Sequence, residues 1–82
     1  MGKLEKYLDK ALCSTLNVKF RELQYLLEHF GFKLRTIRGS HHIYKNDEYG
    51  KMISIQPKDG KAKKYQVDQF VEFLKQNGLL ED

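Results

Sequence analysis

The sequence predicts a small α+β domain in which two helices, three antiparallel strands and a final helix follow one another. Apolar side chains recur with the 3.6-residue period of a helix as far as Phe30, and with the two-residue period of a strand from Phe32 onward. The helical period returns at Val67. A chain of 82 residues allows one domain with one core. Three strands need a cover on one face, and the flanking helices are expected to provide it.

Two helices are expected before Gly31. In the first, over residues 3–12, the apolar side chains occupy one face. The second buries five apolar side chains on one side: Phe20, Leu23, Leu26, Leu27 and Phe30. Between the helices lie Ser14, Thr15 and Asn17, and any of these polar side chains could cap the second helix. Gly31 is expected to end that helix in the left-handed conformation.

Three strands are expected over residues 32–37, 41–45 and 52–56. The first is expected to alternate strictly, so that one face carries Phe32, Leu34 and Thr36. Tight connections are expected at Gly39-Ser40 and over residues 46–50, where turn-forming residues gather.

The third strand is expected to end at Pro57, because proline cannot donate a hydrogen bond to a strand ladder. Residues 58–64 then form a polar loop rich in lysine. The last helix ends near Gly78, and its core face carries Val67, Phe70, Val71 and Leu74.

The positive charge gathers in the middle of the chain. The net charge is +4 overall, but residues 31–66 contain nine basic and three acidic residues, a net charge of +6. Residues 67–82 contain one basic and four acidic residues, a net charge of −3. This concentration favours a polyanionic partner, and the alternative is that the cations solvate an exposed sheet face. The size excludes a large enzyme with an enclosed pocket, but not a small catalyst that acts on a polymer.

The single cysteine indicates the expected compartment. Cys13 cannot form an internal disulfide, so a reduced, cytoplasmic setting is expected. The first 16 residues alternate charged and apolar side chains, which is not the pattern of a signal peptide or of a membrane span. Cys13 is interpreted as a small, half-buried apolar residue.

The most informative string is Arg38-Gly39-Ser40-His41-His42-Ile43-Tyr44. Adjacent residues of a strand point to opposite faces, so His41 and His42 cannot bind one metal ion together, and no metal site is expected. An exposed imidazole titrates near neutral pH and can move a proton. The alternative is a pair of strand histidines without a catalytic role.

From Asn17 to its C-terminus, the chain resembles the HicA toxins, which are small RNA-cleaving toxins of bacteria and archaea. The matching residues are Phe20-Arg21-Glu22-Leu23, Leu26-Leu27-Glu28, Gly31-Phe32, Gly39-Ser40-His41-His42-Ile43-Tyr44, Ile55-Gln56-Pro57 and Phe73-Leu74-Lys75-Gln76-Asn77-Gly78-Leu79. The resemblance implies an α-β-β-β-α fold similar to double-stranded-RNA-binding domains, with residues 17–82 as its core. Residues 1–16 would then be a helical extension.

The resemblance also implies an activity and a partner. It implies an endoribonuclease that attacks mRNA without a metal or other cofactor until a HicB-type antitoxin protein covers it. The histidine that directly follows glycine-serine is the catalytic one in this family, which here is His41, with His42 as the second candidate. At Lys58-Asp59-Gly60, where the family commonly has a further histidine, this chain has none.

An RNA nuclease needs little from the protein, because RNA supplies its own nucleophile, the 2′-hydroxyl. One histidine can transfer the proton, basic side chains can stabilise charge on the phosphate, and tyrosine rings can stack on unpaired bases. The candidate RNA contacts are Arg38, Gly39, Ser40, Tyr44, Lys45, Lys58, Lys61, Lys63 and Lys64, with Tyr49 as a further stacking ring.

Two rival functions remain at this stage. One is a non-catalytic RNA-binding module of the same fold. The other is a protein-interaction domain whose first helix docks on a partner or on a second copy, which leaves a homodimer open.

Overall fold

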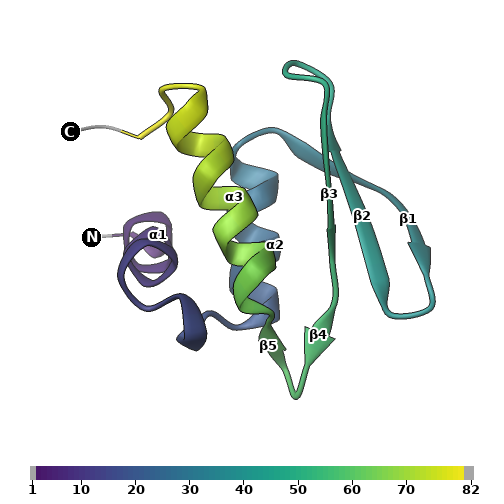
Figure 1. Cartoon of the computed structure of the whole chain (residues 1–82), viewed down its shortest axis with the longest axis horizontal. Coiled ribbons are helices and arrows are strands. Elements are labelled where there is room, and N and C mark those ends of the chain that lie inside the picture. The colour runs from purple at the N-terminus through teal and green to yellow at the C-terminus, as the bar shows by residue number, and fades with distance from the viewer. Residues whose placement is uncertain (1, 81–82) are drawn as a thin grey trace.

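The computed structural model describes residues 2–80, which form helices, one larger sheet and a small hairpin (Figure 1). The helical elements in chain order are α1 (Lys3–Cys13), the 3₁₀ turn η1 (Thr15–Asn17), α2 (Phe20–His29) and α3 (Lys64–Gln76). The strands are β1 (Phe32–Arg38), β2 (His41–Asn46), β3 (Lys51–Ile55), β4 (Pro57–Lys58) and β5 (Lys61–Ala62). No helix within the described residues is long and apolar enough to cross a membrane.

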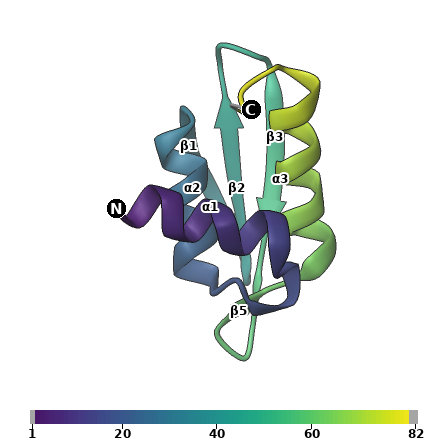
Figure 2. The same cartoon turned by 90° about the vertical axis from the view of Figure 1, so that its left-hand side faces the viewer.

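The elements form three layers. Strands β1, β2 and β3 make an antiparallel sheet in that order, and α2 and α3 cover one of its faces (Figure 1). Helix α1 crosses α2 and α3 on their side away from the sheet (Figure 2). The predicted α+β class, the element order α-β-β-β-α and the additional N-terminal helix are confirmed. We call the uncovered face of the sheet the open face and the other the helix face.

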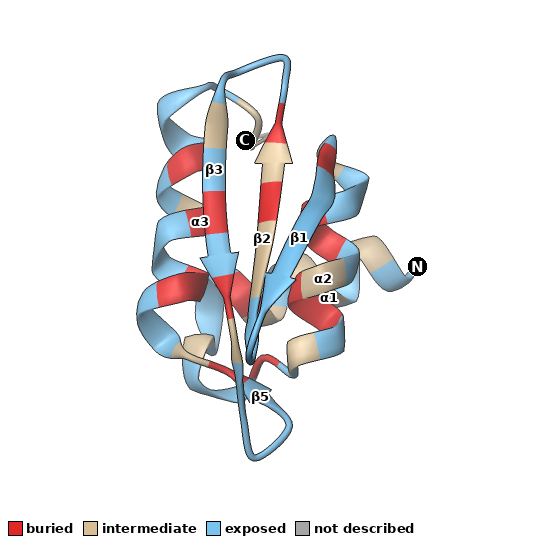
Figure 3. Ribbon diagram, turned by 90° about the vertical axis from the view of Figure 1, so that its right-hand side faces the viewer, coloured by how far each residue is buried: buried red, intermediate tan, exposed pale blue. Residues whose placement is uncertain are grey.

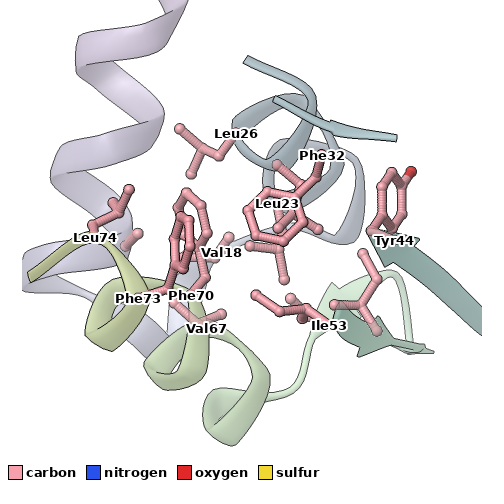
Figure 4. Packing of buried hydrophobic residues seen from close by; sticks show 14 residues of the cluster. Val18, Leu23, Leu26, Phe32, Tyr44, Ile53, Val67, Phe70, Phe73 and Leu74 are labelled. Atoms are coloured by element: carbon pink, nitrogen blue, oxygen red, sulfur yellow. The ribbon is translucent and has the colours of Figure 1, made fainter. Parts of the chain in front are cut away.

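The core lies between the helix face and the helices. Tyr44 and Ile53 of the sheet belong to one buried cluster with Phe70 and Phe73 of α3 (Figure 4). Buried residues alternate along β2 and β3, whereas β1 is exposed after its first residue (Figure 3). The alternation means that every second residue of β2 and β3 points toward the helices. Ala11 of α1 is buried in the same cluster, so α1 contributes to this core.

The strict alternation predicted for the first strand is wrong. Leu34 pairs with Tyr44, but the next pair is Thr36 with Ile43, so the register shifts at Arg35. Such a bulge moves the following side chains to the opposite face. As a result Ile37, rather than Thr36, lies on the helix face.

The lysine-rich loop predicted after Pro57 is also wrong, because strands β4 and β5 form a short hairpin there. Asp59 and Gly60 have φ angles of 54° and 80°, which are the positive values that a two-residue hairpin turn requires. The hairpin is fixed to the start of α2 and to the residues just before it: the Phe20 N–H donates to the Gly60 carbonyl over 3.0 Å, and the Ala62 N–H to the Val18 carbonyl over 2.9 Å.

The start of α2 is capped by Glu22 and not by the polar residues after α1. The Lys19 N–H donates to Glu22 Oε1 over 2.9 Å, and Lys10 Nζ of α1 donates to the same oxygen over 2.8 Å. Burial alone would raise the pKa of the Glu22 carboxyl, but these two hydrogen bonds and the charges of both lysines hold it below its ordinary value. Gly31 ends the helix with a φ of 94°, as predicted.

Candidate functional site: the histidine pair and the lysine hairpin

The histidine pair begins β2, directly after the tight turn that leaves β1. Gly39 has a φ of 61°, a left-handed conformation that suits the first position of a two-residue hairpin loop. His41 and His42 follow Ser40 and point to opposite faces of the sheet, as the strand period predicts. The turn therefore places one imidazole on each face at the same end of the sheet.

His41 lies on the open face. It is exposed, and its register partner on β1 is Arg38, which is also exposed. Within residues 2–80 the His41 ring makes no side-chain hydrogen bond, ion pair or aromatic contact. His41 and Arg38 thus form an exposed corner of the open face.

His42 lies on the helix face and is half-buried. Its Nδ1 is 3.1 Å from the carbonyl oxygen of Ser40. Its ring packs edge-on against Phe20 of α2, with ring centroids 4.9 Å apart and an interplanar angle of 69°. Its register partners are Ile37 on β1 and Ile55 on β3. The His42 imidazole is therefore held by a hydrogen bond, an aromatic ring and aliphatic neighbours.

Four of the predicted RNA contacts are brought together at the β4–β5 hairpin and the start of α3. These four contacts are Lys58, Lys61, Lys63 and Lys64. Together with Asp59, Ala62 and Leu16, they line a surface hollow of about 530 Å³. Asp59 is the only acidic residue among the lining side chains. We call the four lysines, Lys58, Lys61, Lys63 and Lys64, the lysine hairpin. Lys64 Nζ also pairs with Asp68 Oδ2 at 2.7 Å, so part of its charge is already neutralised.

The histidine pair and the lysine hairpin lie at the same end of the molecule (Figures 1 and 3). Phe20 links them, because its backbone N–H bonds to Gly60 in the hairpin turn while its ring lies against His42. The structure thus brings the histidine pair and a group of lysines to the same end of the molecule.

Two predicted contacts do not join this end. Lys45 is four residues beyond His41 along β2, about 13 Å at the rise of a strand, and its Nζ lies 3.7 Å from Asp47 Oδ1. Tyr44 is 1% exposed, and Gln24 donates to its hydroxyl over 3.1 Å. Burial raises the pKa of that hydroxyl, against the opposing hydrogen bond from Gln24. Its buried ring offers no face to a base, so the stacking role expected for Tyr44 is wrong.

Two other side chains differ from or extend the sequence-based expectation. Cys13 is exposed and not half-buried. Tyr49 is 38% exposed, and its ring packs edge-on against Phe73. Among residues 2–80, no three His, Cys, Asp or Glu side chains gather in a geometry that could hold a metal ion.

Sequence reasoning did not identify Phe20 or Glu22 as part of this end of the molecule. Phe20 was expected only as a core residue of the second helix, and it contacts His42, 22 positions further along the chain. A contact so distant in sequence leaves no local pattern. By contrast, the Asp59-Gly60 pair is a local hairpin signal that predicts the turn carrying the lysines.

Comparison with known proteins gives the same family as the histidine motif. A family model described as the HicA toxin of bacterial toxin–antitoxin systems matches residues 20–79, which include α2, the whole sheet, the hairpin and α3. Neither a curated protein nor a solved structure matches the chain significantly. Helix α1 lies outside the matched segment. The chain belongs to the HicA toxin family, and so is the toxin of a toxin–antitoxin pair with an antitoxin as its partner.

Proposed function

We propose that this toxin is an endoribonuclease that cuts single-stranded mRNA at the end of the molecule formed by the histidine pair and the lysine hairpin. The observation that carries the proposal is the double contact of Phe20, which lies against His42 and bonds to the hairpin turn. This contact joins the end of the sheet that bears the histidine pair to the lysine hairpin, which supports the proposal that one RNA strand can reach both. Membership of the HicA family supports the same reading.

The proposed reaction uses the substrate as nucleophile. An imidazole nitrogen accepts the proton of a 2′-hydroxyl, the 2′-oxygen forms a bond to the adjacent phosphorus, and the bond from phosphorus to the 5′-oxygen breaks. The leaving oxygen takes up a proton, so the products carry a 2′,3′-cyclic phosphate and a 5′-hydroxyl. Lysine side chains stabilise the charge that develops on the phosphate. The proposed reaction requires no metal ion or other cofactor.

The family resemblance nominates His41 as the proton-transfer residue and His42 as the second candidate. The proposed RNA contacts are the exposed turn Gly39-Ser40, Arg38 beside it and the lysine hairpin. Lys45 is a more distant contact for the same strand. We further propose that a HicB-type antitoxin covers this end of the molecule, and that both proteins act in the cytoplasm, where mRNA is available.

The test is cleavage of a short single-stranded RNA by the purified toxin in the presence of EDTA. We expect products with 2′,3′-cyclic phosphate ends. A matched oligonucleotide with 2′-deoxynucleotides throughout should remain intact, because it lacks the nucleophile. Equal cleavage of both oligonucleotides, or no cleavage of the RNA by a freshly purified and folded sample, would contradict the proposal.

The second candidate is a toxin that binds RNA without cutting it. The Lys58-Asp59-Gly60 segment favours this reading, since it carries no histidine at the place where the family commonly has a second one. Such a protein would bind single-stranded RNA with an affinity that falls steeply with salt, by a log–log slope of about 0.7 for each phosphate contacted. It would yield no products after prolonged incubation, and this outcome separates the two candidates.

A further inference from the structure

Tyr65, in the first turn of α3, is the most exposed aromatic residue among residues 2–80. Its side chain is 59% exposed, against 38% for Tyr49 and 37% for Tyr25. The rings of Tyr49 and Tyr25 each pack against another ring, those of Phe73 and Tyr7. Within the described residues the Tyr65 ring makes no such contact. The ring therefore contributes little to the core and is accessible to a ligand.

The Tyr65 ring is nonetheless held in place through its hydroxyl. Gln66 Nε2 donates to the Tyr65 hydroxyl over 3.3 Å, and Gln66 Oε1 accepts a hydrogen bond from the Gln56 N–H over 3.0 Å. Gln66 is itself only 1% exposed. A buried amide that is bonded at both ends holds its partners in place, so the ring loses little further freedom when a ligand binds to it.

Tyr65 connects the two parts of the proposed site. Along the chain it directly follows two residues of the lysine hairpin. Through Gln66 it is tied to Gln56, the residue directly after β3, and the last residue of β3 pairs with His42 at the start of β2. Tyr65 therefore adjoins both the cations that would hold phosphates and the end of the sheet that bears the histidine pair.

From these observations we infer that Tyr65 is a stacking site for one unpaired base of the bound RNA. The inference rests on the proposed function, because it needs an RNA strand at the lysine hairpin. Lysines hold the phosphates of any strand, whereas an aromatic ring adds a contact with the face of a base. In a duplex the neighbouring bases cover both faces, so the Tyr65 ring takes a base only from a single strand. Tyr65 thus provides a preference for single-stranded RNA that the lysines alone do not.

The test measures binding without cleavage. The probe is a labelled single-stranded 2′-O-methyl oligonucleotide, which has no free 2′-hydroxyl and so cannot be cut by the proposed reaction. Fluorescence anisotropy gives its Kd. We expect Tyr65→Leu, which removes the ring, to weaken binding at least about fivefold, the lower end of the usual contribution of one stacked base. Tyr65→Phe keeps the ring without the hydroxyl and should bind within about twofold of the parent.

Tyr25→Leu is the matched control, because Tyr25 is also an exposed tyrosine but packs against Tyr7 of α1. It should bind the probe within about twofold of the parent, and thermal melts confirm that each variant is folded. Two further probes separate stacking from charge. A strand of the same length without bases, and a duplex of the same sequence, should each bind to Tyr65→Leu about as tightly as to the parent, since neither offers the face of a base.

Three results would overturn the inference. One is a folded Tyr65→Leu variant that binds the single-stranded probe as tightly as the parent. Another is an equal loss in Tyr65→Phe and Tyr65→Leu, which would assign the effect to the hydroxyl and its bond with Gln66. The third is a loss of the same size on the probe without bases, which would show that Tyr65 acts on the phosphate contacts.

The same measurements separate a failure of the inference from a failure of the proposed function. If the parent cuts RNA but Tyr65→Leu binds the probe as the parent does, the nuclease function stands and the stacking site is wrong. If binding depends on Tyr65 as expected but the parent cuts no RNA, the stacking site stands and the nuclease function is wrong. A folded parent that binds no single-stranded probe would overturn both.

Discussion

The two faces of β2 at its first turn provide two very different settings for the same side chain. On the open face, His41 is exposed, and its register partner on β1 is the exposed Arg38. On the helix face, His42 contacts a backbone carbonyl and the ring of Phe20, whose backbone N–H donates to the Gly60 carbonyl in the β4–β5 turn. The difference shows that a histidine motif in a strand contains two candidates, and that the packing behind the strand distinguishes them.

The strongest test of this comparison reverses charges at the lysine hairpin and, separately, on β1. Reversing two cations of the lysine hairpin, Lys61→Glu with Lys63→Glu, should weaken binding to single-stranded RNA by at least about tenfold near 0.1 M salt and flatten the salt dependence. The matched double reversal on β1, Lys33→Glu with Arg35→Glu, should cost less than about threefold. Fluorescence anisotropy with labelled RNA measures both effects.

A larger loss from the β1 reversal than from the hairpin reversal would show that RNA lies along the open face of the sheet.

The first turn of α2, which carries Phe20 against His42, is joined to α1 by the ion pair between Lys10 and Glu22. Lys10→Met leaves the Glu22 carboxylate buried without its ammonium partner, so we expect the free energy of unfolding to fall by about 2 kcal/mol. Lys6→Met removes an exposed lysine from the same helix and should change stability by less than about 0.5 kcal/mol. Urea unfolding followed by circular dichroism measures both, and equal stability of the two variants would show that the ion pair contributes nothing.

Acid should weaken the same contact. The folded-state pKa of Glu22 is lower than its ordinary value of 4.5. Its ionised form therefore stabilises the fold at pH values above 4.5, and this contribution disappears as the pH falls through the folded-state pKa. We expect the stability difference between the parent and Glu22→Gln to be constant near neutral pH and to narrow below 4.5.

Urea titrations of the parent and of Glu22→Gln at a series of pH values check this expectation. A difference that widens as the pH falls would mean that the Glu22 pKa is raised in the folded state, and that Lys10 does not compensate for burial.

The smallest expected effect concerns Gly39, in the turn that connects β1 to β2. Gly39→Ala adds no steric clash, since no atom lies within 4 Å of the new Cβ, but it forces alanine to a φ of 61°. We expect a loss of about 1 kcal/mol in the free energy of unfolding. Gly2→Ala, at a position with an extended backbone and the same open surroundings, is the control and should lose less than about 0.5 kcal/mol. Equal losses would mean that the turn tolerates alanine.

Much of the fold could be predicted because its signals are local. The apolar period defined α2 and α3, the two-residue period defined the strands, and Gly31 was correctly expected to end α2 with a positive φ. The bulge at Arg35 could not be predicted, because it depends on how β1 pairs with β2. The β4–β5 hairpin was missed although its Asp59-Gly60 turn is visible in the sequence.

The candidate site was only partly predictable for a related reason. Opposite orientations of His41 and His42 follow from the strand period alone, but the period does not say which face the helices cover. Tyr44 was a candidate for stacking on RNA bases, and its burial depends on packing between β2 and α2. The contact between Phe20 and His42 joins two elements that are distant in sequence, and only the tertiary structure brings them together.

The most direct measurement compares single-turnover RNA cleavage by His42→Ala and by His41→Ala, with thermal melts confirming that both variants are folded. We expect His41→Ala to cut the RNA at least about 100-fold more slowly than the parent, the usual contribution of a positioned general base. For His42→Ala we expect a loss of less than about tenfold. A folded His41→Ala variant that cuts RNA at nearly the parental rate, with His42→Ala inactive, would contradict the assignment of His41.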